Sequence, residues 1–134
     1  MNIFSKLLIA GVLAFTSLAS YAHAQDAVNV TADALSNQFD ENPLKAEKEY
    51  KNKSLNITAK VHEVYKDLNG KFRINALYEK GWDAGMKVTI LYAYLTPEAL
   101  DKAADLSFGD SVTLHCTSVD KDVMLTAYSC DIVE

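Results

Sequence analysis

Residues 55–62 read LNITAKVH, and their side chains alternate strictly between apolar and polar. The apolar members, from Leu55 to Val61, therefore share one side of the chain, which is the period of a half-buried β-strand. The alternation slips at Val64, and this predicts a bulge or a bend. We expect the first strand of a sheet here.

Four further strands are expected downstream, at residues 72–76, 88–95, 112–116 and 123–133. Residues 67–70 (DLNG) predict a turn before the second strand, because Asn-Gly is a strong hairpin signal. Residues 79–85 (EKGWDAG) predict a glycine-containing connection. Residues 96–98 (TPE) predict the start of a short helix, since Thr caps helices and Pro suits the first helical position. Residues 120–122 (DKD) predict a polar turn before the fifth strand.

Two short helices are expected before the first strand. Thr31 can cap a helix over residues 31–40, and Asn42-Pro43 begins a second helix that ends at residues 51–53. The order is then α-α-β-β-β-α-β-β. Five strands with one helix between the third and the fourth match a five-stranded OB-fold barrel, preceded here by N-terminal helices. A β-sandwich usually has about seven strands and is the second choice.

The first residues have the pattern of an export signal. Lys6 precedes an apolar run at residues 7–18, and residues 22–24 (AHA) offer small side chains for a signal peptidase. The run has about a dozen residues, whereas a membrane-spanning helix needs about 20; a retained anchor is the alternative. We expect a periplasmic or secreted protein without a membrane span after cleavage. The chain has no cysteine near the expected cleavage site, so it does not have the pattern of a lipoprotein. We expect three parts: a signal peptide at residues 1–24, an N-terminal helical extension at residues 25–53 and an OB-fold domain at residues 54–134.

The charge of the chain bears on its partners. Lys and Arg total 13 against 18 Asp and Glu, for a net charge of −5. Nucleic-acid-binding domains normally carry a basic surface, so this balance argues against a nucleic-acid partner. Residues 64–88 are a net-positive stretch, with five basic and three acidic side chains.

Three stretches carry a resemblance to a known family. They are NPLKAEKEYKNK at residues 42–53, LSFGDSVT at residues 106–113, and Cys116 together with VMLTAYSCDIV at residues 123–133. Together they resemble the tRNA-anticodon-binding-like OB-fold family of exported bacterial proteins. The resemblance implies an OB-fold and an exported protein, and it gives no catalytic residue to carry over.

Cys116 and Cys130 are the two cysteines of the chain. An exported protein meets an oxidising compartment, which favours a disulfide between them, with two buried thiols as the alternative. If the hairpin turned tightly at residues 120–122, Cys116 would lie opposite about Thr126, and a disulfide needs Cα atoms within about 7 Å. We therefore predict an irregularity between Val119 and Ser129 that brings the cysteines together.

No pattern for catalysis or metal binding stands out. His62 and His115 lie on the outward parity of their strands without the spacing of a metal site, so they are interpreted as surface histidines. The sequence contains no G-x-S-x-G elbow, no P-loop and no paired-Cys zinc motif. We expect no enzymatic activity, no metal and no cofactor.

A ligand-binding face is the sharper hypothesis. OB-folds bind oligonucleotides or oligosaccharides on strands two and three and the adjoining loops. The basic and aromatic residues of these regions are Lys66, Lys71, Arg73, Trp82, Lys87, Tyr92 and Tyr94. Such side chains can stack on sugars or bases and neutralise anionic groups. As alternatives, Tyr92 and Tyr94 belong to the core, and the basic residues are a solvated surface.

These observations favour a non-catalytic binding protein whose partner is a protein or an anionic oligomer such as a glycan. The main alternative is a structural or inhibitory module that grips a protein through a strand edge. A small hydrolase is the third possibility, although the sequence offers no candidate nucleophile.

Overall fold

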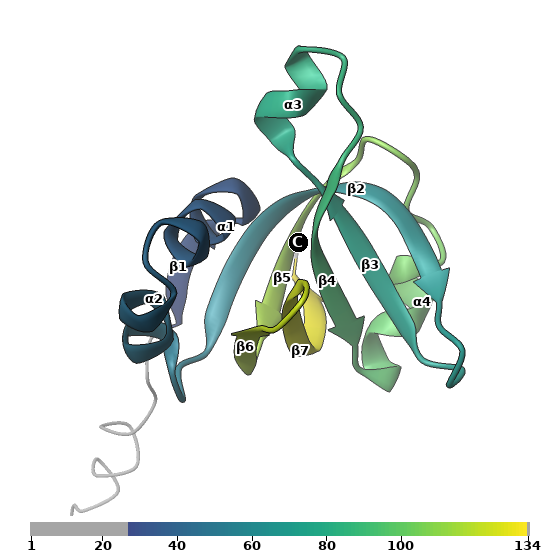
Figure 1. Cartoon of the computed structure of the whole chain (residues 1–134). Helices are drawn as coiled ribbons and strands as arrows, with labels where there is room; N and C mark the ends of the chain where they lie inside the picture. The colour runs from purple at the N-terminus through teal and green to yellow at the C-terminus, as the bar shows by residue number, and fades with distance from the viewer. Residues whose placement is uncertain (1–26, 134) are drawn as a thin grey trace, which may run out of the picture.

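The computed structural model describes residues 27–133, which fold mainly into β-strands with a few short helices (Figure 1). The expected signal peptide at residues 1–24 lies outside the described residues. The elements in chain order are β1 (Val28–Thr31), α1 (Ala32–Glu41), α2 (Pro43–Tyr50), β2 (Leu55–Lys66), β3 (Phe72–Leu77), α3 (Glu79–Asp83), β4 (Thr89–Leu95), η2 (Pro97–Ala99), α4 (Leu100–Ala103), β5 (Ser111–Cys116), β6 (Ser118–Lys121) and β7 (Leu125–Val133).

The two N-terminal helices begin where their caps predict. The Thr31 side chain accepts the N–H of Ala34 at 3.1 Å, and the Asn42 side chain accepts the N–H of Lys45 at 3.1 Å. Each bond satisfies a backbone donor that the first turn of a helix leaves unpaired. Figure 1 shows both helices beside β1 and β2. Phe39 of α1 and Tyr50 of α2 are buried in one cluster with the apolar side chains of the sheet.

The strand pairings follow an OB-like order. The sheet runs β1-β2-β3-β4-β7-β5, and β5 also pairs with β2, so the pairing returns to the strand that carries the alternating sequence. β2 is long enough for this, because its 12 residues pair first with β5 and then with β3. The predicted irregularity in β2 is confirmed as a register shift between Val61 and Glu63. The five predicted strands correspond to β2, β3, β4, β5 and β7, with η2 and α4 between the third and the fourth.

Three elements were not predicted. β1 lies parallel to β2, with Val28 opposite Leu55, and adds a strand before the helices. α3 occupies the stretch interpreted as a glycine-containing connection, and it projects from the rest of the fold (Figure 1). β6 covers residues 118–121, so the predicted turn at residues 120–122 is wrong. The hairpin turns at residues 122–124, because Lys121 pairs with Leu125.

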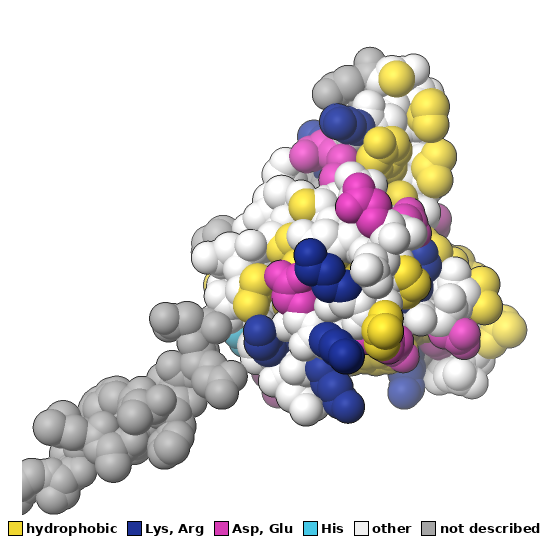
Figure 2. Space-filling view, turned by 60° about the vertical axis from the view of Figure 1, so that its left-hand side comes forward, with side chains coloured by type: hydrophobic (Ala, Val, Ile, Leu, Met, Phe, Trp, Pro, Cys, Tyr) yellow, Lys and Arg dark blue, Asp and Glu magenta, His cyan; other side chains and the backbone are white. Residues whose placement is uncertain are grey.

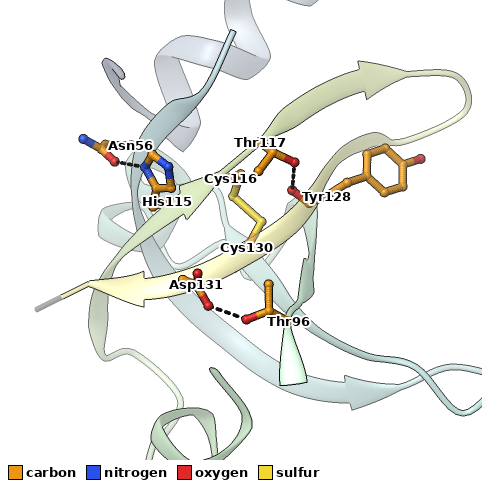
Figure 3. The surroundings of a disulfide bond; sticks show 8 residues. All are labelled: Asn56, Thr96, His115, Cys116, Thr117, Tyr128, Cys130 and Asp131. Atoms are coloured by element: carbon orange, nitrogen blue, oxygen red, sulfur yellow. Dashed lines mark hydrogen bonds between the residues drawn. A yellow bond between two sulfur atoms is a disulfide. The ribbon is translucent and has the colours of Figure 1, made fainter. Parts of the chain in front are cut away.

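This later turn explains how the disulfide forms. Cys116 and Cys130 are bonded, and their Cα atoms lie 4.1 Å apart (Figure 3). The neighbouring pair, His115 with Asp131, sets the register that places the cysteines opposite each other on β5 and β7. Cys116 therefore does not face Thr126, and the predicted disulfide is present.

The predicted irregularity near Ser129 is also found. Leu125 and Ala127 are buried, and strict alternation from them would turn Cys130 outward. Ser129 has a φ of 52°, in the left-handed region that non-glycine residues seldom adopt. Its backbone breaks the alternation, so that Tyr128 and Ser129 are exposed while Cys130 is fully buried. Figure 3 shows the Tyr128 ring pointing away from the disulfide.

Candidate ligand-binding face

Four side chains form a row across the outer face of the sheet. Register pairs Tyr65 of β2 with Arg73 of β3, and Arg73 with Tyr94 of β4. Tyr128 of β7 continues the row, with its ring centroid 6.1 Å from that of Tyr94. Strands lie about 4.8 Å apart, so three spacings give a length of about 14 Å. We call these four residues the aromatic row.

Arg73 is held in the middle of this row by aromatic rings. Its guanidinium carbon lies 3.7 Å from the ring centroid of Tyr92, 4.4 Å from that of Tyr65 and 5.8 Å from that of Tyr94. These positions place a cation over electron-rich ring faces, which attract it. Nε donates to Asn75 Oδ1 at 2.8 Å, and Nη1 donates to the Tyr94 hydroxyl at 3.2 Å. Neither of these two hydrogen bonds uses Nη2. Because the contacts hold the guanidinium in place, the two N–H groups of Nη2 have a fixed orientation.

Asp67 supports the row from the turn between β2 and β3. Oδ1 accepts the backbone N–H groups of Asn69 at 2.8 Å and Lys71 at 2.9 Å, and Oδ2 accepts the Tyr94 hydroxyl at 3.1 Å. The Lys71 N–H, followed by the Tyr94 hydroxyl, the Asn69 N–H and the Arg73 charge, lowers the pKa of Asp67 against the opposing effect of desolvation. Asp67 is therefore ionised at neutral pH and carries a fixed negative charge beside Arg73.

A groove of about 620 Å³ lies beside the Tyr94 and Tyr128 end of the row. The two rings are nearly parallel, with an angle of 8° between their planes. The groove is lined by the 67–72 turn, the end of β4, residues from η2 and α4, and the β7 residues Tyr128 and Ser129. It therefore combines aromatic, apolar and polar side chains in one open depression.

The structure brings together only some of the residues predicted from sequence. Arg73, Tyr92 and Tyr94 are in direct contact, and Lys71 lines the groove. Lys66 lies close by, with Nζ 5.5 Å from the Phe72 ring centroid. The alternative that Tyr92 and Tyr94 belong to the core is wrong: they are half-buried, whereas their neighbours on β4, Leu91 and Ala93, are fully buried.

Two predicted residues lie elsewhere. Lys87 is outside the aromatic row, with Nζ 5.3 Å from the Phe108 ring centroid. Trp82 lies in α3, and its side chain is outside the described part of the structure. In Figure 2, hydrophobic side chains follow the projecting segment that contains α3, where Met86 and Val88 are exposed. The predicted set therefore divides between the row with its immediate surroundings and this distant end.

Sequence reasoning missed Tyr65, Tyr128, Asn75 and Asp67. Tyr65 and Tyr128 each lie next to a predicted strand irregularity. This proximity was the signal in the sequence that could have pointed to them as residues of the site. Asn75 is a polar residue inside an apolar strand, where its side chain is 5% exposed and accepts the Arg73 Nε–H. Asp67 was interpreted only as a turn residue, because its bond to Tyr94 spans 27 positions of sequence.

The histidines contact other polar side chains. His62 Nδ1 lies 2.6 Å from Thr89 Oγ1, and His115 Nδ1 lies 2.8 Å from Asn56 Oδ1. Both rings are half-buried rather than fully at the surface. Within residues 27–133, no group of three or more His, Cys, Asp or Glu side chains could hold a metal ion. The helices of this described part are all too short and too polar to cross a membrane.

The side of the molecule that carries α1 and α2 is not a basic surface. Figure 2 turns this side forward, and basic side chains there are interspersed with acidic ones. One cross-contact is the ion pair of Lys121, from the β6 hairpin, with Asp40 of α1. The mixture leaves the aromatic row as the stronger candidate for binding.

Comparison with known proteins supports the fold. A crystal structure of a candidate nucleic acid-binding lipoprotein from Klebsiella pneumoniae superposes with a TM-score of 0.60 at 15% sequence identity. The match covers 90% of this chain and 100% of that one. No curated protein matches the chain. The tRNA_anti-like family model matches residues 10–127. The resemblance identified from sequence is therefore confirmed, and the chain belongs to the tRNA_anti-like family.

Proposed function

We propose that this chain is an exported, non-catalytic binding protein in which a five-stranded OB-fold barrel presents the aromatic row to an anionic oligosaccharide. The observation that carries the proposal is the position of the Arg73 guanidinium. It is held 3.7 Å from the Tyr92 ring centroid, and its hydrogen bonds to Asn75 and Tyr94 use Nε and Nη1 but not Nη2. A planar guanidinium is well suited to a carboxylate, because it offers parallel N–H donors. Export is supported by the leader pattern at residues 1–24 and by the buried disulfide.

The length of the row supports an oligomer rather than a single small molecule. The row crosses four strands over about 14 Å, and it contains three tyrosine rings and one cation. Tyr65 and Tyr128 are 39% and 42% exposed, so their rings can be reached by a ligand. Aromatic rings provide large, rigid surfaces with one polar tip, which suits ligands made of linked rings.

The local charge favours a glycan over a nucleic acid. Three basic side chains near the row, Lys66, Lys71 and Arg73, stand against two acidic ones, Glu63 and Asp67, so the local net charge is +1. Nucleic-acid binding relies on neutralising several phosphates, and this surface offers few cations for a chain with one negative charge on every unit, so a glycan that is charged on only some of its units fits it better. The fixed charge of Asp67 would also repel a phosphate placed over Tyr94. A nucleic acid is the alternative ligand, since the Klebsiella protein is described as nucleic acid-binding. A comparison of sugar hexamers with an oligonucleotide distinguishes the two.

Charge reversal of Arg73 tests the proposal, with Lys87 as the matched control. Arg73→Glu is expected to weaken binding of hexagalacturonate at least about tenfold, because hydrogen bonds to charged groups contribute about 1.5–3 kcal/mol. The loss should be largest at low salt, where exposed charges are least screened. Lys87→Glu changes the same charge outside the row and should change the dissociation constant less than about twofold. Isothermal titration calorimetry at two salt concentrations gives both values.

Arg73→Gln keeps a polar side chain without the cation and guards against a folding defect in Arg73→Glu. If both Arg73 variants bound hexagalacturonate like the wild type, the row would not be the site. A protein partner held by a strand edge would be recovered from periplasmic extract equally by wild type and by the Arg73 variants, and this result would also contradict the proposal.

A further inference from the structure

The groove at the Tyr94 and Tyr128 end of the row differs chemically from the position of Arg73. Its two charged side chains are Asp67 and Lys71, which balance each other. The Asp67 carboxylate is oriented by three hydrogen bonds, and Oδ2 receives only one of them, from Tyr94. A carboxylate oxygen has room for a further donor. The groove therefore offers a fixed acceptor beside an aromatic surface.

This combination selects against a second acidic group. A carboxylate or phosphate placed against Asp67 Oδ2 would be repelled, because like charges at close range repel each other. A neutral unit that carries O–H groups has the opposite relation, since each hydroxyl can donate to the carboxylate in a charge-assisted hydrogen bond. Pro97 and Leu100 add apolar surface to the lining of the groove. One face of a sugar ring presents C–H groups, which suit the rings of Tyr94 and Tyr128.

The dimensions agree with a unit of this kind. A volume of about 620 Å³ is within the range of about 300–1,000 Å³ that is typical of small-ligand sites. Arg73 lies on β3 and Tyr128 on β7, with β4 between them. Tyr94, on β4, lies directly opposite Arg73 at one strand spacing of about 4.8 Å, which is about the distance between neighbouring sugar rings of one chain.

Building on the proposed function, we propose that the groove is a subsite for a neutral sugar unit that neighbours an acidic unit bound at Arg73. The preferred ligand is then an oligosaccharide in which acidic and neutral units alternate. The neutral unit packs against Tyr94 and Tyr128 and donates a hydroxyl to Asp67, while Arg73 binds the carboxylate of its neighbour.

Four hexamers test this preference on the full exported protein. They are hyaluronan hexasaccharide with alternating units, uniformly acidic hexagalacturonate, neutral cellohexaose, and the deoxyribonucleotide dT6. The alternating hexasaccharide is expected to bind about tenfold more tightly than hexagalacturonate, because only its neutral unit can donate hydroxyls to Asp67 without bringing a second charge. Calorimetric dissociation constants for all four are compared in one buffer.

Two variants assign the preference to the groove. Asp67→Asn keeps Oδ1 as an acceptor for the turn but removes the charge, so it should abolish the preference for the alternating hexasaccharide. Tyr128→Ala should weaken the same ligand about fivefold through loss of the ring surface. Phe108→Ala removes a ring of similar exposure, 45% against 42%, at a site outside the row, and should leave the affinity unchanged.

The outcomes separate the two proposals. Equal binding of the two acidic hexasaccharides, unaffected by Asp67→Asn, overturns the neutral subsite while the proposed function stands. Failure of wild type to bind either acidic hexasaccharide contradicts the proposed function itself. Tightest binding of dT6, further strengthened by Asp67→Asn, contradicts both and identifies a nucleic-acid site.

Discussion

Phe39→Ala is expected to lower the free energy of unfolding by about 3–5 kcal/mol, the usual cost of removing a buried phenylalanine ring. Phe39 is 2% exposed, and its ring centroid lies 6.2 Å from that of Tyr50. Both rings belong to the same buried cluster as the side chains of β2, β4 and β5. A cavity in α1 should therefore destabilise the sheet as well as the helices. Urea unfolding followed by far-UV circular dichroism gives the midpoint.

Leu44→Ala is the matched control for this prediction. Leu44 is a similarly large apolar side chain in α2, but it is 62% exposed, so its removal should change the stability by less than about 0.5 kcal/mol. Loss of stability in Phe39→Ala within a single transition supports one shared core. Two separate transitions, with the sheet unfolding as in the wild type, would show that the helices fold independently of it.

Loss of the Cys116–Cys130 disulfide has the second large effect. The bond joins residues 14 positions apart, and closing a loop of this length stabilises the folded state by about 3 kcal/mol in the chain-entropy model. A Cys116→Ala/Cys130→Ala double variant should therefore unfold at a clearly lower urea concentration than the oxidised wild type. Its midpoint should be the same with and without dithiothreitol, whereas reductant should lower that of the wild type.

Burial predicts how the wild-type bond responds to reductant. Both cysteines are fully buried, so a thiol can reach them only after local or global opening. Reduction of the folded protein should therefore be slow and should accelerate in urea. Rapid reduction under native conditions, measured by thiol alkylation and mass spectrometry, would show that β5 and β7 separate easily and would contradict the packing described here.

The sequence predicted the parts of the fold in which one face is buried along a regular element. The alternation from Leu55 to Val61 survives as the buried face of β2, since a one-residue slip would expose the whole set. β1 has only four residues and forms through pairing with a distant strand, a contact that local periodicity does not contain. Val123 was assigned to the fifth strand, yet it is 92% exposed in the turn.

The candidate site was predicted in part for a similar reason. Arg73 and Tyr94 follow from the OB-like strand order and from residue type. Tyr65 and Tyr128 required knowledge of two breaks in alternation, the register shift after Val61 and the left-handed Ser129, which decide the face on which a side chain emerges. Such breaks are set by tertiary packing, so sequence indicates their neighbourhood but not their outcome.

Chemical-shift mapping tests the central claim most directly. The backbone and side-chain resonances of the ¹³C,¹⁵N-labelled exported protein are followed while hyaluronan hexasaccharide is added. We predict that the largest shifts occur at Tyr65, Arg73, Tyr94 and Tyr128, with Phe108 and the residues of β1 unaffected. Saturable shifts at the β1 edge or around Phe108, with those four residues unchanged, would contradict the assignment of the aromatic row as the binding face.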